Sequence, residues 1–250
     1  MNSSVTDFRV GVIKPLECIK EGWALIKEQY WLFFGISFVG ILIGGLVPIV
    51  LLGPMMAGIF FCLFERQRGR PVEFSLLFKG FDYFVQSLVV MVLKMIPIMV
   101  LMIPYYIFMV AVMFTTMPRD HTPSTDEQTQ FLFSFLGVEL VFVLVIVVVS
   151  ILLEIFFMLA FPLVPDRKLS GLEALKLSFK AGKANFGGLL GLILLNGLFS
   201  IIGVLCCFVG VYFYLPVALA AQAVAYRRIF PEMTIDFSAP TPPPPPANWA

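Results

Sequence analysis

The chain has 250 residues, of which 60% are hydrophobic, and its 17 Lys and Arg nearly balance its 16 Asp and Glu. A net charge of +1 excludes the broad basic field of a nucleic-acid binder, and a soluble fold of this size cannot bury so much apolar surface. The apolar blocks are long enough to cross a bilayer core about 30 Å thick. They cover residues 31–64, 84–115, 131–163 and 186–226. The sequence therefore predicts an all-α membrane protein with six transmembrane helices in three hairpins.

The charges between these blocks predict the orientation of the chain. Fifteen of the 17 basic residues lie in the tails or around 66–79, 166–183 and 227–228. The exceptions are Lys94, inside an apolar block, and Arg119, in the polar stretch 115–130. Because loops rich in Lys and Arg stay in the cytoplasm, we expect both termini there and 115–130 outside. Residues 1–30 show no pattern of a cleaved signal peptide.

The first predicted unit, hairpin A (12–68), is an amphipathic helix followed by two spans that turn near Gly44–Gly45. The apolar residues of the amphipathic helix recur at spacings of four and three, which places them on one face. These residues are Val12, Leu16, Ile19, Trp23, Ile26 and Tyr30. Pro54 is expected to kink the return span near mid-membrane.

The second unit, hairpin B (74–165), also begins with a short amphipathic segment. Its apolar residues are Phe74, Leu77, Phe78 and Phe81. The two apolar stretches that follow, of 32 and 33 residues, are longer than a bilayer requires. Tilt, kinks at Pro97 and Pro104, or extension into the external space could absorb the excess.

The third unit, hairpin C (170–230), begins with the clearest amphipathic helix, which Ser170 and Glu173 start as an S-x-x-E capping box. Its apolar face holds Leu172, Leu175, Phe179 and Phe186, and Lys176, Lys180 and Lys183 form another face. We expect these lysines to contact anionic lipid headgroups at the membrane surface. Packing of the helix on the protein itself is the alternative.

Hairpins A and C share a pattern that suggests an internal repeat. Pro54 precedes Arg66 by twelve residues, and Pro216 precedes Arg228 by the same distance. In this alignment Phe64 and Tyr226 also correspond. Matched broken helices in two repeats are typical of transporters, although proline in membrane helices often serves packing alone.

Two long motifs resemble a known group of proteins. Residues 161–186 (FPLVPDRKLSGLEALKLSFKAGKANF) and 214–230 (YLPVALAAQAVAYRRIF) resemble the C-terminal part of uncharacterised bacterial membrane proteins. This group includes the membrane domain attached to some glycerophosphodiester phosphodiesterases. Residues 53–81 (GPMMAGIFFCLFERQRGRPVEFSLLFKGF) are similar to the first half of the same proteins. The resemblance implies six helices in a bacterial inner membrane. It implies no hydrolysis, because the catalytic barrel of those phosphodiesterases is absent.

Polar groups inside the apolar blocks are the candidate functional residues, because a charge there costs roughly 2.5–3.5 kcal/mol. Lys94 and Glu154 lie at similar depths on antiparallel helices, so we expect them to face one another. Such a pair is either a pathway for an ion, proton or substrate, or a structural link between helices. Glu139 is expected nearer the outer boundary, and Asn196 and Gln222 are neutral groups of the type that bridges helices.

Motifs for catalysis are missing from the sequence. The single histidine, His121, lies in the polar external stretch, and the four cysteines show neither CxxC spacing nor clustering with histidine. There is no H-E-x-x-H, G-x-S-x-G or phosphate-binding glycine loop. We therefore expect no enzyme activity, no metal and no cofactor.

The last residues, 231–250, are predicted to form a disordered cytoplasmic tail. Pro242, Pro243, Pro244, Pro245 and Pro246 favour a polyproline helix, which Trp249 follows as an exposed anchor. The tail either binds a cytosolic partner or is inert. The sequence thus favours a membrane scaffold or accessory protein, and a small-solute or ion transporter is the alternative. Gly187 and Gly191 form a G-x-x-x-G motif suited to packing within the chain or to a homo-oligomer.

Overall fold

The computed structural model describes residues 7–116, 124–205 and 209–232, and every regular element in these ranges is helical. Six stretches are long and apolar enough to cross a membrane, which confirms a multi-pass, all-α membrane protein. His121, two of the four cysteines (Cys206 and Cys207) and the predicted tail with Pro242–Pro246 and Trp249 lie outside the described residues.

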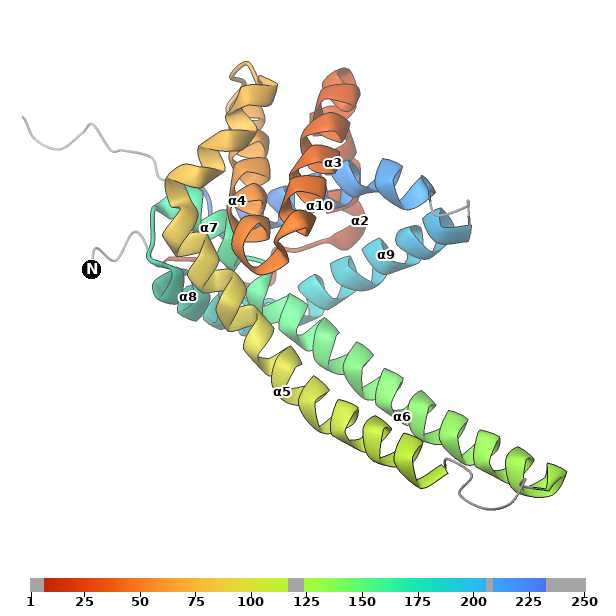
Figure 1. The fold of residues 1–250 in the computed structure, drawn as a ribbon. Helices are drawn as coiled ribbons and strands as arrows, with labels where there is room; N and C mark the ends of the chain where they lie inside the picture. Colours follow the sequence, from red (N-terminus) through yellow and green to blue (C-terminus); the bar gives the residue numbers. More distant parts are fainter. Residues whose placement is uncertain (1–6, 117–123, 206–208, 233–250) are drawn as a thin grey trace, which may run out of the picture.

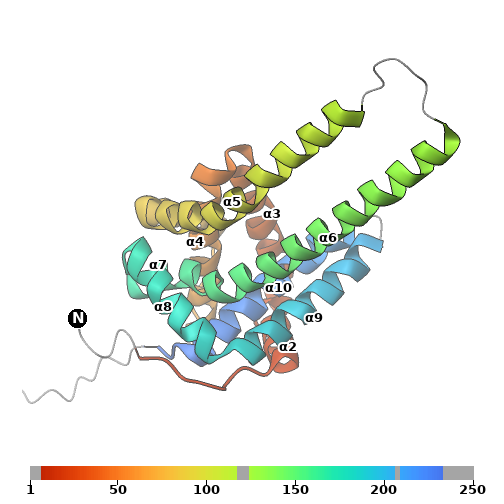
Figure 2. The same cartoon turned by 90° about the horizontal axis from the view of Figure 1, so that it is seen from below.

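The helices pack into a body from which one long arm projects. In chain order they are α2 (Pro15–Ile26), the 3-10 turn η1 (Lys27–Gln29), α3 (Tyr30–Leu46), α4 (Pro48–Gln67), the 3-10 helix η2 (Phe74–Tyr83), α5 (Phe84–Thr116), α6 (Thr125–Phe157), α7 (Ala160–Arg167), α8 (Gly171–Ala184), α9 (Phe186–Leu205) and α10 (Val209–Ile229). The arm consists of α5 and α6, which lie side by side (Figures 1 and 2). At 33 residues each, they are about 50 Å long.

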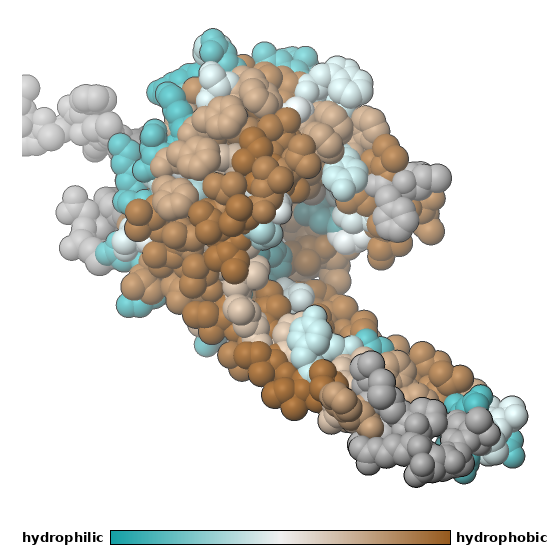
Figure 3. All heavy atoms as spheres, viewed as in Figure 1, coloured by the Kyte–Doolittle hydropathy of each residue, from teal (hydrophilic) through white to brown (hydrophobic). Residues whose placement is uncertain are grey.

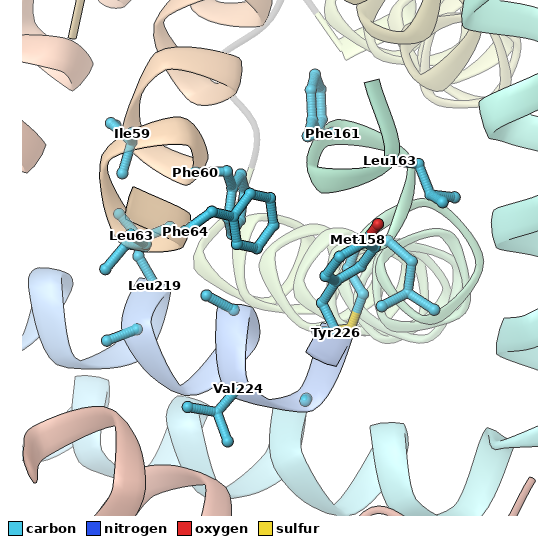
Figure 4. Close-up of a cluster of buried hydrophobic side chains, with 14 of the residues drawn as sticks. Ile59, Phe60, Leu63, Phe64, Met158, Phe161, Leu163, Leu219, Val224 and Tyr226 are labelled. Atoms are coloured by element: carbon cyan, nitrogen blue, oxygen red, sulfur yellow. The ribbon is translucent and has the colours of Figure 1, made fainter. Parts of the chain in front are cut away.

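The core of the body lies where α4, α7 and α10 meet (Figure 4). Phe60 and Phe64 of α4 are fully buried there, beside Phe161 of α7. The ring of Tyr226 on α10 lies 5.2 Å from that of Phe64, centroid to centroid. Phe64 and Tyr226 are the residues that correspond in the predicted repeat, so equivalent positions of hairpins A and C touch in the core.

α2 packs on α10 through a close approach of the two backbones at Gly22. A Cβ on Gly22 would lie only 2.6 Å from the Ala221 nitrogen, so the two backbones nearly touch. Cys18 and Ile26, one turn to either side of Gly22, are fully buried in the same contact. Because Gly22 has no side chain, α2 and α10 approach closely and pack over more of their length.

The large apolar residues that the sequence grouped on α2 and α8 divide between the core and the outward faces, since Ile19, Ile26 and Leu175 pack on the protein. Leu16 and Trp23 of α2 are 59% and 47% exposed, and Leu172 and Phe179 of α8 are 54% and 51% exposed. The face that α8 buries instead consists of Gly171, Ala174, Leu177, Ser178, Ala181 and Gly182. The predicted amphipathic faces are thus split between side chains packed on the protein and side chains facing outward.

η2 is a 3-10 helix of ten residues where the sequence suggested an ordinary amphipathic helix. It lies along α4, and Gly58 and Gly80 touch where the two elements cross. A Cβ on Gly58 would collide with the Leu77 carbonyl, and a Cβ on Gly80 with the Pro54 carbonyl. Of the predicted apolar face only Leu77 is buried, whereas Phe74, Phe78 and Phe81 are exposed. This 3-10 run of ten residues is longer than usual.

The segment before α2 crosses the junction of α8 and α9, where Asn185 holds it. The side-chain oxygen of Asn185 accepts the Gly11 N–H at 2.8 Å, and its amide nitrogen donates to the Arg9 and Ala181 carbonyls at 3.0 and 3.1 Å. The Arg9 N–H also donates to the Ile229 carbonyl at 2.9 Å. Both ends of the described chain are therefore tied together.

The G-x-x-x-G motif on α9 serves packing within the chain at one of its two positions. Gly191 lies against the ring of Pro15, the first residue of α2, whereas Gly187 has open space where a Cβ would point. The neighbouring Gly188 lies against Ile13.

Candidate functional site

Lys94 and Glu154 meet at the base of the arm. The Lys94 ammonium donates to the Glu154 carboxylate at 2.6 Å, and the two side chains are 18% and 38% exposed. The same ammonium lies 5.9 Å from the ring centroid of Phe161, which belongs to the core of the body. The structure thus brings the two predicted residues together where α5 and α6 leave the body.

Glu139 forms a second polar contact between the helices of the arm. The Tyr105 hydroxyl lies 2.9 and 2.8 Å from the two carboxylate oxygens, to which it can donate its proton. The Tyr105 ring also stacks on Phe142 with centroids 3.7 Å apart. Within the described residues no basic side chain pairs with Glu139. The tyrosine partner was not predicted, because Tyr105 carries no charge that would single it out among the apolar residues of α5.

The other intramembrane polar residues bridge neighbouring helices. The Tyr214 hydroxyl of α10 donates to the Asn196 side-chain oxygen of α9 at 2.7 Å. The Gln222 amide of α10 donates to the Met158 carbonyl, between α6 and α7, at 2.8 Å. Each amide thus has a hydrogen-bond partner within the protein, which the surrounding hydrocarbon could not supply.

Pro54 and Pro216 both lie inside continuous helices, α4 and α10. Near Pro216, the Tyr30 hydroxyl donates to the Phe213 carbonyl at 2.7 Å. A proline disturbs the helical hydrogen bonds of the preceding turn. The Tyr30 hydroxyl supplies a donor to a carbonyl of that turn.

A buried cluster around Asp166 joins the ends of α4, α7 and α10. The Asp166 side chain is 5% exposed, and Arg227 binds it with two nitrogens at 2.7 and 3.0 Å. The Tyr226 hydroxyl donates to Asp166 at 2.7 Å, and the Arg68 guanidinium donates at 3.2 Å. We call these four residues the Asp166 cluster. The sequence showed charges at three block ends but not their pairing.

Arg68 extends the Asp166 cluster towards the exterior. Its guanidinium donates to Glu65 at 3.0 Å and to Glu232 at 3.1 Å. Burial works against the charged form, but the hydrogen bonds that Arg68 donates to Glu65 and Glu232 raise the pKa of Arg68 above its usual value. The guanidinium therefore stays charged and fixes the exit of α4 against α7.

The capping box at the start of α8 is confirmed. The Ser170 hydroxyl accepts the Glu173 N–H at 3.4 Å, and the Glu173 carboxylate accepts the Ser170 N–H at 3.2 Å. Hydrogen bonds from the Ser170 hydroxyl and backbone lower the pKa of Glu173, so the carboxylate stays ionised at neutral pH.

The outward face of α8 combines lysines with large apolar side chains. Lys176, Lys180 and Lys183 are exposed, and none enters an ion pair in the part of the chain that the structure describes. The Lys180 ammonium lies 5.7 Å from the ring centroid of Phe8. The apolar members of this face are Leu172, Phe179 and Phe186.

The arm carries shallow grooves without polar lining groups. The larger, about 540 Å³, lies on α6 and is lined by Phe133, Gly137, Val138, Val141, Phe142 and Val145. Hydrophobic side chains cover the visible face of the arm and much of the body, and hydrophilic ones gather along one edge (Figure 3). Among the described residues no group of three or more His, Cys, Asp or Glu side chains could hold a metal ion.

No family model, curated protein or solved structure matches this chain. The candidate sites therefore rest on their own geometry. The Lys94–Glu154 pair can link two helices or respond to a passing charge, and the outward face of α8 can contact anionic headgroups.

Proposed function

We propose that this chain is a non-enzymatic scaffold or accessory protein of a bacterial inner membrane, which contacts anionic lipid and a cytosolic partner. Its spans would form three hairpins, α3/α4, α5/α6 and α9/α10, introduced by α2, η2 and α8, with both termini in the cytoplasm. The positive-inside bias supports this orientation. The resemblance to bacterial membrane proteins supports the compartment.

The outward face of α8 is the observation that carries the lipid contact. Its small residues are already buried on the protein, so Leu172 and the three lysines cannot pack there as well, and Phe179 stays 51% exposed although its ring lies 4.5 Å from that of Phe156. By helical spacing the lysines lie beside the apolar side chains on this face, the arrangement of a helix lying in the headgroup region. Anionic lipid headgroups supply the negatively charged partners that these unpaired lysines lack.

Replacing Lys176, Lys180 and Lys183 by glutamine should reduce the amount of phosphatidylglycerol that stays bound to the purified protein. Each lysine near an anionic surface contributes about 1 kcal/mol. Native mass spectrometry after detergent extraction measures the bound lipid. A matched control changes Lys14, Lys79 and Lys168, three exposed lysines outside α8, to glutamine. Equal lipid retention by the two triple variants would contradict the lipid contact at α8.

Deleting residues 238–250 should remove the cytosolic partner that the proline-rich tail is proposed to bind. Five consecutive prolines offer an extended helix whose binding requires little ordering. Affinity purification after cross-linking, compared between the full chain and the deletion, identifies proteins that depend on the tail. A variant with only Trp249→Ala separates the aromatic anchor from the prolines. Identical partner profiles for all three proteins would show that the tail is inert.

Transport is the second candidate function, and the Lys94–Glu154 ion pair inside the predicted spans favours it. Under this alternative the double variant Lys94→Met with Glu154→Gln should abolish flux or proton coupling in proteoliposomes, because the charges would be part of the pathway. A scaffold would keep its fold and its bound lipid. The exchanged pair Lys94→Glu with Glu154→Lys is the control, since it retains the ion pair.

A further inference from the structure

α2 carries three different faces, and one of them packs closely on α10. Cys18, Gly22 and Ile26 are buried, with Gly22 against the Ala221 backbone of α10. This close contact fixes the rotation of α2 about its axis, because no other face has a glycine that allows such an approach. The directions of the other two faces follow from it.

The second face of α2 is acidic and is neutralised within the chain. Glu17 and Glu21 accept hydrogen bonds from Arg228 of α10 at 3.0 and 2.6 Å. Glu28, just beyond α2, accepts a hydrogen bond from Arg66 of α4. Arg66 and Arg228 are equivalent residues of the predicted repeat, and both hold this face. Within the described residues, these acidic groups pair with Arg228, Arg66 and Lys14, and none pairs with Lys20 or Lys27.

The third face points outward and joins apolar and basic side chains. Leu16, Lys20, Trp23 and Lys27 follow at spacings of four, three and four, which places them on one side of the helix. Leu16 is 59% and Trp23 is 47% exposed. Lys20 and Lys27 are exposed too, and no ion pair involves them within residues 7–116, 124–205 and 209–232.

Aromatic residues continue this face towards the first predicted span. The Trp23 ring lies 5.6 Å from that of Tyr30, which lies 5.5 Å from Trp31. Trp31 is 71% exposed. Tryptophan and tyrosine concentrate at the level of lipid headgroups, where an apolar ring and a polar tip both find partners.

We propose that the outward face of α2 is a second binding surface for anionic lipid, separate from α8. Leu16 and Trp23 enter the membrane at the headgroup level, and Lys20 and Lys27 contact the phosphates of anionic lipids. The proposal rests on the membrane location in the proposed function. The charges indicate an anionic lipid, because the unpaired charges on this face are the two lysines. The apolar side chains of Leu16 and Trp23 lie beside them and suit the acyl-chain boundary.

Fluorescence of Trp23 tests the depth of this face. The chain has three tryptophans, so Trp31→Phe with Trp249→Phe leaves Trp23 alone. The full-length variant is reconstituted in vesicles that contain phosphatidylcholine brominated either near the glycerol end or near the methyl end of its chains. We expect stronger quenching by the shallow bromines. Equal quenching at both depths, or quenching by aqueous acrylamide alone, would overturn the proposal.

The role of the lysines is tested by replacing brominated phosphatidylcholine with brominated phosphatidylglycerol, which carries an anionic headgroup. In the parent protein, brominated phosphatidylglycerol should quench Trp23 more strongly than brominated phosphatidylcholine. Lys20→Gln or Lys27→Gln should lower this preference by up to about fivefold each. Lys14→Gln is the matched control, because Lys14 already pairs with Glu17 at 3.0 Å and should leave the preference unchanged. Equal effects of all three changes would contradict a specific contact.

These experiments separate failure at α2 from failure of the proposed function. If the α8 lysine variant keeps its bound lipid while Trp23 remains shallow, the contact at α8 is wrong and the one at α2 stands. If the protein inserts into vesicles and no brominated lipid quenches Trp23, the contact at α2 is wrong although the membrane location holds.

Discussion

Replacing Asp166 by asparagine should lower the free energy of unfolding by roughly 3 kcal/mol, near the lower end for breaking a buried ion pair. Arg227 and Arg68 would lose a shared carboxylate that is 5% exposed, and two guanidinium groups would be left close together. Arg68 is 30% exposed, so water recovers part of the loss. Thermal unfolding of the purified protein in detergent, followed by circular dichroism, measures the change.

Asp82→Asn is the control for the Asp166 variant. Asp82 is exposed, at the end of η2, so its neutralisation should leave the unfolding temperature nearly unchanged. If both variants unfold at the same temperature, the Asp166 cluster does not stabilise the ends of α4, α7 and α10.

Replacing Gly58 by alanine should have an effect of similar size through packing alone. The new methyl group would collide with the Leu77 carbonyl, a backbone atom that cannot rotate away, so η2 and α4 must separate. Overpacking of this kind costs roughly 1–3 kcal/mol, and sometimes more. The same unfolding measurement applies, together with the rate of limited proteolysis between α4 and η2.

Gly197→Ala provides the matched control for the Gly58 variant. Gly197 lies inside α9 with open space where its Cβ would point, so alanine should be neutral or stabilising because of its higher helix propensity. A Gly58 variant as stable as the Gly197 variant would show that η2 does not need this close approach.

The sequence predicted the membrane class well because composition alone decides it. Four apolar blocks cannot remain in water, and the described residues contain six stretches able to span a membrane. The Lys94–Glu154 contact also followed from the sequence, because two charges at matched depth in antiparallel helices have few other partners. The capping box at Ser170 and Glu173 was readable because it is local.

The buried faces of α2, η2 and α8 were harder to predict for a physical reason. Hydrophobic periodicity identifies the face that carries large apolar side chains such as Trp23 and Phe179. In lipid, however, both the inward and the outward face of a helix can be apolar, so this face need not be the buried one. Small residues such as Gly22 and Gly58 then decide which side packs. The pairing within the Asp166 cluster depends on contacts between residues 61 and 98 positions apart, which no local pattern reveals.

The packing of α2 on α10 also determines when this protein can finish folding. Gly22 must wait for Ala221, 199 residues later in the chain, before its contact exists. At ribosomal speeds this delay is about 10–40 s. During that time α2 is already made but lacks its contact with α10, and the segment before α2 cannot yet reach Ile229. The packing of α2 on α10 therefore forms only after α10 has been synthesised, so truncation within α10 would leave the Gly22 face of α2 without this partner.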